Sequence, residues 1–412
     1  MEMEKEHRSS HPRLVLVPLP FQGHINPMLQ LGSILHSKGF SITVLHTAFN
    51  SPIPSNYPEF VFVSIPDNLS EQLISADDLL PFISLLNLNC GVLFQECLAK
   101  MVQKQEVENE PSIACIIYDE CMYFCDAVAK YVKLPSIVLR TTSASTYLSR
   151  NAILQLKAEG VLTSQVSTSQ DLVPGLHPLR LKDQKQCQVG IFPVGPLHEV
   201  APASSSSLIK EDNSCITWLE KQKQNTVLYV SLGSLASVDK KELGEMAWGL
   251  ANSKQPFLWV IRPGSVDDQE WKKLLTEGFV EAVGENGCIV KWAPQTEVLA
   301  HGAVGGFWTH CGWNSTLESI SEGVPMICKP CFGDQRVNAR HASQVWRIGI
   351  QLENMCERGE VERAIKRLMV DKEGKEMRQR AKNLKERIQL DIREGGSSYN
   401  SLNELIELIM SF

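Results

Sequence analysis

The sequence predicts an α/β protein built from two Rossmann-like domains. Short apolar segments that suit buried strands alternate with helical segments in both halves of the 412-residue chain. The alternation stops once, in a stretch rich in Pro and Ser at residues 192–214, and then starts again. The chain is also long enough for two domains with separate hydrophobic cores. We therefore predict a first domain at residues 1–191, a linker at 192–214, and a second domain with a helical tail at 215–412.

The first half begins with a continuous apolar run at residues 14–18, which is typical of a parallel strand buried on both faces. A helix is predicted to begin at Asn26-Pro27, because proline favours the first helical position, and to end before Gly39. The other predicted elements are strands at 41–46 and 60–64, a helix at 79–104, a strand at 113–118, a helix at 122–131 and a strand at 136–139. This order indicates a parallel sheet covered by helices on both faces.

The second half repeats the pattern. Its predicted elements are a strand at 227–231, a helix at 240–252, strands at 257–261, 288–291 and 304–309, a helix at 315–321, a strand at 326–328 and a helical tail at 361–409. Gly312 is expected to interrupt the chain after the strand at 304–309, and Asn314 or Ser315 to cap the following helix. A strand, a glycine-containing turn and a helix N-terminus form an anion site, because free backbone N–H groups and the positive end of the helix dipole point at the ligand.

The composition excludes several classes of partner. The chain has 40 Lys and Arg against 47 Asp and Glu, a net charge of −7, and no basic cluster predicts binding to nucleic acid or to an anionic membrane. The N-terminal residues are polar, unlike a signal peptide, and no apolar run reaches the length of a membrane span. We therefore expect a cytoplasmic protein without a membrane anchor, and a monomer.

Twelve cysteines in a chain without a secretory signal predict reduced thiols. Cys328 and Cys331 form a CxxC, and Cys121 and Cys125 form a looser pair. A zinc site would need two well-spaced pairs, and a redox site would need its CxxC at the start of a helix. The pattern therefore favours small buried side chains over either kind of site.

Polar residues follow several predicted strands at the edge where ligands of an open parallel sheet bind. In the first half these are Gln22-Gly23-His24 after the first strand and Asp119 after the strand at 113–118. In the second half they are Ser231, Gly233 and Ser234, then Trp292, His310, Asp334 and Gln335. The two sets are expected to face a single cleft, and Ser234 has the size and place for a phosphate contact.

The segment from Trp292 to Gln335, which contains THCGWNSTLE, resembles the signature box of plant family 1 UDP-dependent glycosyltransferases and matches it without a gap. The resemblance covers most of the chain, and the N-terminal half is similar to the branch of cytokinin and diterpenoid glucosyltransferases. It implies that the two Rossmann-like domains face each other across a cleft, in the arrangement called GT-B. It also implies that UDP-glucose is the co-substrate and that no cofactor is used.

The resemblance implies a role for each residue of the box. By likeness, Trp292 stacks on uracil, while Gln295 and Glu318 hold the ribose. By the same likeness, the diphosphate is bound by His310, Asn314 and Ser315 beside Gly312, and the sugar is contacted by Trp313, Asp334 and Gln335. In the family, a glutamine at the last position of the box is associated with glucose as the donor sugar.

Each of these residues also has a structural interpretation. Trp292 fits an ordinary core position, and His310 a structural one. Ser315-Thr-Leu-Glu318 fits a capping box, in which the Glu318 carboxylate folds back on the helix start. Asp334 and Gln335 equally suit a turn after a glycine.

His24 is the candidate general base. It is expected in a loop before a helix N-terminus, whose dipole would keep the imidazole neutral and able to accept a proton. Asp119 would orient the other ring nitrogen and stabilise the cation that forms. In the plainer interpretation, His24 hydrogen-bonds its loop and Asp119 caps a helix. The resemblance favours the catalytic one, because its GHINP segment carries the base in the family.

These observations predict an inverting, metal-independent glucosyltransferase that acts on a hydroxyl, carboxyl or nitrogen of a lipophilic small molecule. Apolar segments at 79–93 and 141–156 are expected to line the acceptor side of the cleft. The acidic pairs Asp77-Asp78 and Asp267-Asp268 have the residue type of Mg²⁺ ligands, but their polar context favours solvated surface. The helix dipole can meet the charge of the leaving diphosphate instead.

One departure from the family pattern leaves an alternative function open. Several dozen residues are missing between segments 179–183 and 187–192, where the family has a helix and a strand near the acceptor pocket. A lost strand leaves an uncovered sheet edge, so the chain could bind a UDP-sugar without transferring it. A second rival is a nicotinamide oxidoreductase on the same fold. Against it, the first strand is followed by PLPFQGHINP and by no G-x-G-x-x-G.

Overall fold

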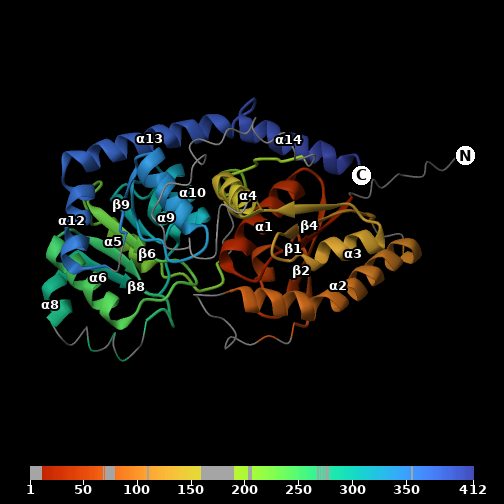
Figure 1. The fold of residues 1–412 in the computed structure, drawn as a ribbon, viewed down its shortest axis with the longest axis horizontal. Coiled ribbons are helices and arrows are strands. Elements are labelled where there is room, and N and C mark those ends of the chain that lie inside the picture. The colour runs from red at the N-terminus through yellow and green to blue at the C-terminus, as the bar shows by residue number, and fades with distance from the viewer. Residues whose placement is uncertain are drawn as a thin grey trace, which may run out of the picture.

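The computed structural model contains two α/β domains side by side, each with its own parallel sheet (Figure 1). The structure describes residues 12–67, 69, 79–108, 111–158, 190–202, 207–266, 269, 271, 273, 278–353 and 356–412. The predicted junction near residues 183–187 and the acidic pairs at 77–78 and 267–268 lie outside these ranges.

The first domain holds a five-stranded sheet in the order β3-β2-β1-β4-β5, and every neighbouring pair is parallel. Its strands are β1 (Arg13–Val17), β2 (Ser41–Thr47), β3 (Val61–Ile65), β4 (Ile113–Asp119) and β5 (Ser136–Leu139). Its helices are α1 (Gln22–Ser37), α2 (Leu80–Glu108), α3 (Phe124–Val132) and α4 (Ala144–Ala158), with a short 3₁₀ turn at Pro54–Asn56. Residues 14–17 of β1 are fully buried, because helices cover both faces of the sheet.

The second domain holds a six-stranded sheet in the order β11-β10-β9-β6-β7-β8, again parallel throughout. Its strands are β6 (Val227–Ser231), β7 (Phe257–Val260), β8 (Gly287–Val290), β9 (Val304–Thr309), β10 (Met326–Cys328) and β11 (Gly349–Gln351). Its helices are α5 (Ser214–Leu219), α6 (Lys240–Ser253), α8 (Val280–Val283), α9 (Gln295–Ala300), α10 (Trp313–Ser321), α11 (Gln335–Arg340) and α12 (Arg358–Met369). Shorter helical turns lie at Leu197–Glu199, Gly284–Asn286 and His341–Val345.

The two sheets share one topology. In each, the chain moves outward from the first strand and then crosses back to pair on that strand's other side, so β4 lies beside β1 and β9 lies beside β6. The crevice beyond the carboxyl ends of such strand pairs is where doubly wound sheets bind their ligands. The predicted fold class is therefore confirmed.

The predicted strands are all present, and β5, β6, β9 and β10 have the predicted bounds. Two predicted helix starts were wrong. The structure begins α1 at Gln22, five residues before Pro27, and α10 at Trp313, with Gly312 as its N-cap and no side-chain cap. Neither Asn314 nor Ser315 therefore caps α10. The sequence interpretation also missed α4, α5, α9, α11 and β11.

Pro27 lies inside α1 because a distant residue compensates for its missing N–H. Proline cannot donate to the carbonyl four residues earlier, which belongs to Gly23. The Asn314 side chain fills that position, and its Nδ2 donates to the Gly23 oxygen at 2.9 Å. The start of α1 in the first domain is thus joined to the start of α10 in the second.

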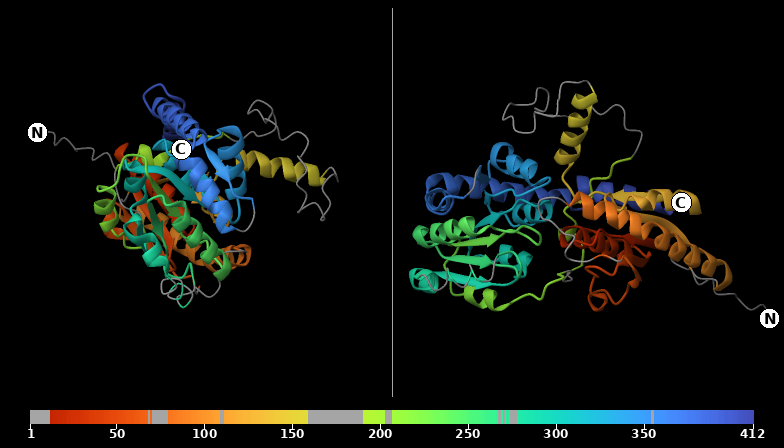
Figure 2. Two further views of the ribbon diagram at one scale, coloured as in Figure 1. Left: turned by 90° about the vertical axis from the view of Figure 1, so that its left-hand side faces the viewer. Right: turned by 60° about the horizontal axis from the view of Figure 1, so that its bottom comes forward.

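The helical tail spans both domains (Figures 1 and 2). After α12, helix α13 (Lys372–Asp391) crosses the second domain and α14 (Ser397–Met410) reaches the first. Leu402, Leu405 and Ile409 of α14 are buried in the hydrophobic core that contains β1 and α1. The tail therefore ties the two domains together.

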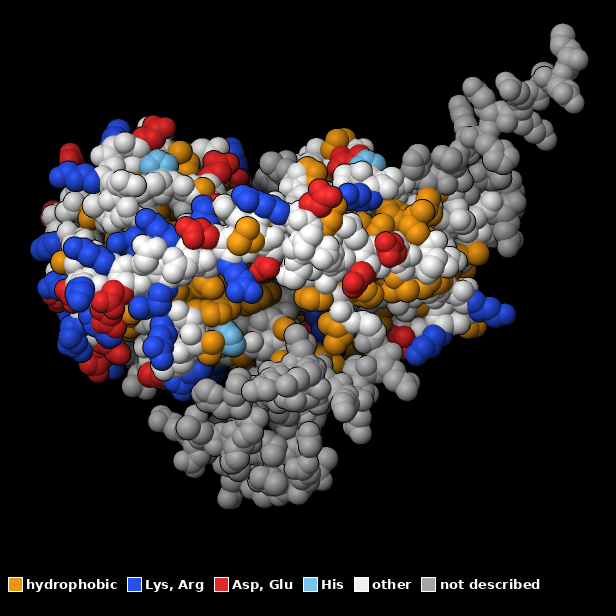
Figure 3. Space-filling model, turned by 90° about the horizontal axis from the view of Figure 1, so that it is seen from above, with side chains coloured by type: hydrophobic (Ala, Val, Ile, Leu, Met, Phe, Trp, Pro, Cys, Tyr) orange, Lys and Arg blue, Asp and Glu red, His pale blue; other side chains and the backbone are white. Residues whose placement is uncertain are grey.

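The surface of the described residues carries charges of both signs. On the face that carries α13 and α14, acidic and basic side chains are intermixed (Figure 3). One described helix, within α2, is long and apolar enough by composition to cross a membrane. Phe82, Leu86 and Phe94 of that helix are buried in the first domain's core, whereas Leu80, Leu88 and Val92 are exposed.

The outer edge of β5 is uncovered within the described part of the chain. No described strand pairs there, and the side chain of Val138 is 43% exposed although β5 has the composition of a buried strand. Helix α4 projects from the domain just after this strand (Figure 2).

Candidate active site

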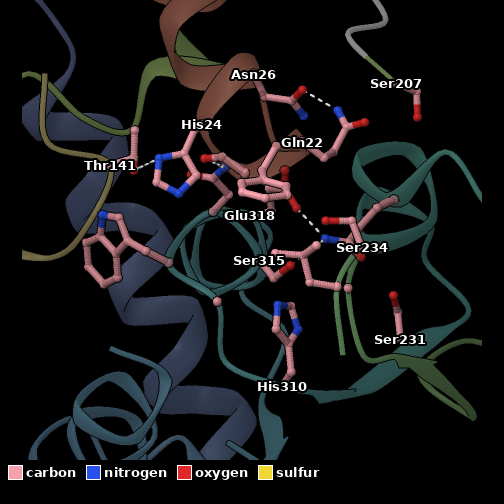
Figure 4. A pocket seen from close by; sticks show the side chains of 18 of the residues that line it. Gln22, His24, Asn26, Thr141, Ser207, Ser231, Ser234, His310, Ser315 and Glu318 are labelled. Atoms are coloured by element: carbon pink, nitrogen blue, oxygen red, sulfur yellow. Dashed lines mark hydrogen bonds between the residues drawn. The ribbon is translucent and has the colours of Figure 1, made fainter. Parts of the chain in front are cut away.

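A cavity of about 270 Å³ lies between the domains, at the carboxyl ends of the central strands. Its walls come from the start of α1 and the segment after β5 on one side, and from the loops after β6, β8, β9 and β10 on the other (Figure 4). All eleven residues of the predicted donor site line it, namely Ser234, Trp292, Gln295, His310, Gly312, Trp313, Asn314, Ser315, Glu318, Asp334 and Gln335. His24 lines it from the first domain.

His24 occupies the first turn of α1 and is held by two side chains. Its Nδ1 lies 2.7 Å from Oδ2 of Asp119 and 3.0 Å from the Thr141 hydroxyl. Asp119 is fully buried, and its other oxygen accepts the N–H of Cys121 at 2.9 Å. A carboxylate needs a donor, so the ring proton belongs on Nδ1 and the lone pair on Nε2. Asp119 thus holds the imidazole and the turn after β4, but it does not cap a helix, because α3 begins at Phe124 with Tyr123 as its N-cap.

The expected electrostatics of His24 were wrong in direction. Burial lowers the pKa of the imidazole, but the charge and hydrogen bond of Asp119 outweigh burial and raise the pKa above its ordinary value of 6.5. Glu120 and Asp334 raise it further. A full carboxylate charge at 2.7 Å exceeds the partial charge of a helix N-terminus. His24 is therefore a stronger base than an isolated imidazole.

The start of α10 offers free donors to the cavity. Thr316 is the first residue whose N–H bonds back to the N-cap carbonyl of Gly312, at 2.9 Å. The amides of Trp313, Asn314 and Ser315 precede it and have no partner within the helix. They lie at the positive end of the helix dipole, which favours an anion at this position.

His310 is a half-buried, neutral side chain that lines the same part of the cavity. Its Nδ1 has no hydrogen-bond partner in the described part of the structure, and burial lowers the pKa of the ring to about 4. The ring fits between two glycines. A Cβ on Gly233 or on Gly312 would come within 2.5 Å of ring atoms, and Gly233 also has a φ of +77°. The ring lines the cavity, whereas its Nδ1 atom is buried away from solvent.

Gln295 connects three side chains on the second domain's wall of the cavity. Its Oε1 accepts the Tyr229 hydroxyl at 3.2 Å, and its Nε2 donates to Ser315 at 2.9 Å and to Glu318 at 2.5 Å. Burial raises the pKa of Glu318. The capping-box interpretation of Glu318 was wrong, because α10 begins before Ser315 and the carboxylate turns toward Gln295 instead.

Trp292 fits both interpretations made from the sequence. Part of the indole packs against the second domain's core, and part lines the cavity. Its Nε1 donates to the hydroxyl of Ser207 in the linker at 2.6 Å. The backbone N–H of Leu208, the next residue, donates to Gln22 of α1 at 2.7 Å. The linker thus fixes the indole and contacts the first domain.

Asp334 and Gln335 lie at the start of α11 and line the cavity. The Gln335 side-chain oxygen accepts the N–H groups of Cys331 and Phe332 at 2.8 and 3.0 Å, so it also shapes the preceding turn. This arrangement leaves the Nε2 group of Gln335 to donate to a ligand. Asp334 Oδ2 accepts the side-chain amide of Asn338 at 2.9 Å.

The sequence interpretation missed Ser207, Tyr229 and Asn338, and it gave Thr141 no role beyond its place in the segment expected to line the acceptor side. Thr141 follows β5 directly, so the rule about strand ends would have found it. Tyr229 lies within a strand, and Ser207 and Asn338 carry no local signal. The acceptor side agrees with expectation in part. Thr141 and Thr142 of the segment 141–156 line the cavity, whereas no residue of 79–93 does, because that segment packs into the first domain's core.

The described residues include no group of three His, Cys, Asp or Glu side chains arranged for a metal ion. Their eleven cysteines are all free thiols. Burial raises the pKa of most of these thiols, including Cys121 and Cys331, as in small buried side chains.

Comparisons with known proteins identify relatives along the whole chain. The sequence model of the family described as UDP-glucoronosyl and UDP-glucosyl transferase matches residues 203–386. The chain is 46% identical to UDP-glycosyltransferase 76E1 of Arabidopsis thaliana, with 96% of each chain covered. It is also 46% identical to flavonol 3-O-glucosyltransferase UGT76E12 of the same plant, with 98% of each covered. Among solved structures, Phytolacca americana UGT2 complexed with UDP-2fluoro-glucose and pterostilbene is similar, with a TM-score of 0.80, 26% identity and 100% of both chains covered.

The chain is shorter than its relatives within the aligned span. The alignment with the flavonol 3-O-glucosyltransferase extends over 454 positions, 42 more than the 412 residues of this chain. That relative therefore has several dozen residues without a counterpart here. Their predicted place, near residues 183–187, lies in the part that the structure does not describe.

Proposed function

The chain belongs to the plant family 1 UDP-dependent glycosyltransferases, and we propose that it transfers glucose from UDP-glucose to a lipophilic small molecule with inversion at the anomeric carbon. The observation that supports this most is the single cavity between the domains. A histidine paired with a buried carboxylate lines one wall, and a helix N-terminus with free amides lines the other.

The proposed reaction is a single displacement. Nε2 of His24 accepts the proton of the acceptor group, and Asp119 stabilises the imidazolium that forms. The acceptor oxygen or nitrogen forms a bond to the anomeric carbon as the bond from that carbon to the phosphate oxygen breaks. UDP leaves with the electron pair, and its charge is met by the first amides of α10 and by neutral His310.

Donor recognition follows from the same walls. The indole of Trp292 supplies a flat apolar face for uracil, and such stacking contributes about 1–3 kcal/mol. Gln295 and Glu318 offer an amide and a carboxylate, which suit the two ribose hydroxyls. Asp334 and Gln335 offer an acceptor and a donor to the sugar, which is the pairing that a hexose hydroxyl needs.

The acceptor is proposed from chemistry and from relatives. Phe21, Leu235 and Phe332 give the cavity apolar walls beside His24. One relative is named a flavonol 3-O-glucosyltransferase, and one solved structure contains pterostilbene. We propose a hydroxyl, carboxyl or nitrogen on a phenolic, terpenoid or cytokinin-like molecule. Mass spectrometry of products from UDP-glucose and a panel of these classes tests the choice.

The test of the base is His24→Ala, with His36→Ala as a matched control on the exposed side of the same helix. Because general-base catalysis supplies about 10²- to 10⁴-fold in rate, kcat should fall by that factor in the first variant while calorimetry shows UDP affinity nearly unchanged. The control should keep its turnover. If His24→Ala retains most of its kcat, the assignment of the base is wrong.

The wild-type protein also separates the rival functions. UDP binding without transfer to any acceptor of the panel would identify a binding protein, in agreement with the uncovered edge of β5. Tighter binding of NADPH than of UDP in a fluorescence titration would identify an oxidoreductase.

A further inference from the structure

One buried amide joins both domains beside the cavity. Asn338 of α11 is 1% exposed. Its Nδ2 donates to Asp334 Oδ2 at 2.9 Å and to the carbonyl oxygen of Cys311 at 3.1 Å. Its Oδ1 accepts the hydroxyl of Ser143, in the first domain, at 3.0 Å. We propose that Asn338 is a positioning residue that sets the carboxylate of Asp334 against the donor sugar and aligns the sugar with the domain that holds His24.

Only a short carboxamide satisfies these three partners. The Asp334 carboxylate and the Cys311 carbonyl both need a donor, whereas the Ser143 hydroxyl needs an acceptor. Aspartate at this position would offer no donor, and serine is too short to reach all three groups. A buried polar group without its partner costs about 1–3 kcal/mol. The three bonds therefore hold the amide in one orientation.

The first of these bonds acts on Asp334. This residue lines the cavity immediately before α11. Burial raises the pKa of its carboxyl group, and the hydrogen bond from Asn338 opposes that rise. The bond thus favours the ionised carboxylate and fixes its plane. An oriented carboxylate accepts hydrogen bonds from sugar hydroxyls at a fixed angle, which a freely rotating one would not.

The second bond acts on the turn that opens α10. Cys311 has a φ of +62°, which costs a residue with a Cβ roughly 1–2 kcal/mol. Its carbonyl is the one that Asn338 holds. The next residue, Gly312, is the N-cap of α10. The side chain of Asn338 therefore fixes the carboxylate of Asp334, and it also supports the turn before the first backbone amides of α10, which we propose bind the diphosphate.

The third bond reaches the base through the first domain. Ser143 is 4% exposed and precedes α4, and its oxygen also accepts the N–H of Thr146 at 3.1 Å. Two residues before it, Thr141 contacts Nδ1 of His24 at 3.0 Å. The segment 141–143 thus contacts the base at one end and Asn338 at the other. The position of the donor sugar and that of the base are therefore linked through four residues.

The test uses two variants, each of which removes a different set of the hydrogen bonds of Asn338. It rests on the proposed function for the choice of UDP-glucose as the ligand. Asn338→Asp keeps the oxygen that faces Ser143 and removes both donors. Ser143→Ala removes only the bond between domains. Calorimetry gives the dissociation constants of UDP and of UDP-glucose for each protein, and steady-state assays at saturating UDP-glucose give kcat.

Asn338→Asp should weaken UDP-glucose at least tenfold more than it weakens UDP, since UDP lacks the sugar that Asp334 contacts. Ser143→Ala should keep the ratio of the two dissociation constants within twofold and lower kcat three- to tenfold. Asn338→Ser, which adds no charge, should change the ratio in the same direction and serves if the aspartate variant does not fold.

Three results would overturn parts of the proposal. An unchanged ratio in both Asn338 variants would show that Asn338 does not act through Asp334. An equal change of the ratio in Ser143→Ala would assign the effect to the domain contact alone. An unchanged kcat in Ser143→Ala would remove the link to the base. Wild-type protein that transfers no glucose would reject the proposed function, whereas the affinity ratio would still decide the role of Asn338 at the sugar.

Discussion

The fit of His310 between two glycines makes Gly312→Ala the sharpest test of the diphosphate site. Gly312 has φ −57° and ψ 146°, which alanine adopts without strain. The only consequence of the new methyl group is therefore a collision, because its Cβ would lie 2.5 Å from Nε2 of His310. Ordinary contacts of a Cβ begin at 3.4 Å, so the ring must move by about 0.9 Å.

The expected loss follows from that displacement. A shift of this size breaks a hydrogen bond between the His310 ring and a diphosphate oxygen. A hydrogen bond to a charged group contributes about 1.5–3 kcal/mol, which corresponds to roughly a 10- to 150-fold increase in Kd. The ring also lies close to Gly233, where a Cβ would come within 2.5 Å of the Cε1 and Nε2 atoms.

Isothermal titration calorimetry with UDP measures the change, and thermal unfolding monitors stability. Gly302→Ala is the matched control, because a Cβ at that exposed turn meets nothing within 4 Å. The control should bind UDP as the wild type does. A dissociation constant for Gly312→Ala within twofold of the wild-type value, in a protein that unfolds normally, would refute the placement of the diphosphate beside His310.

Three further predictions concern other walls of the cavity. The value of kcat/KM should fall as the pH is lowered through the pKa of His24, which lies above 6.5, because the imidazole is protonated at lower pH and cannot act as a base. Asp119→Asn should shift this fall in kcat/KM to lower pH and reduce kcat at least tenfold. Tyr229→Phe should weaken UDP binding about 2- to 12-fold in calorimetry, as expected for about 0.5–1.5 kcal/mol from the bond that orients Gln295, and an unchanged Kd would exclude that role. Gln335→His should reduce the preference for UDP-glucose over other UDP-hexoses in competition assays, whereas unchanged selectivity would show that residue 335 does not contact the sugar.

Local sequence rules were most successful for segments that are buried on both faces. The apolar runs that became β1, β4, β6 and β9 are buried on both sides, and their period and length allow no other use. The same rules failed at Pro27. Proline favours the first position of a helix, so the prediction began α1 there, whereas the structure accepts it inside the helix because Asn314 of the other domain satisfies the Gly23 carbonyl.

Geometry separated the alternatives that the sequence had left open. A capping box and a ligand contact both suit Glu318 until the true start of α10 and the bond from Gln295 are known. The pKa of His24 likewise depends on two opposing effects, burial and the charge of Asp119, a residue 95 positions away. Neither effect has a signature near His24 in the chain, and the expected direction of its pKa was therefore wrong.

The amino-acid sequence by itself predicted the two parallel sheets and named eleven residues that line the cavity, because strand patterns and the box from Trp292 to Gln335 are local features of the chain. The tertiary structure alone decided which side chains hold those residues in place. Asn338 and Ser143 are 195 positions apart, and Asn314 and Gly23 are 291 apart. Hydrogen bonds act over about 3 Å, so such pairs form only after both domains have folded and packed against each other, with α14 of the tail anchored on the first domain.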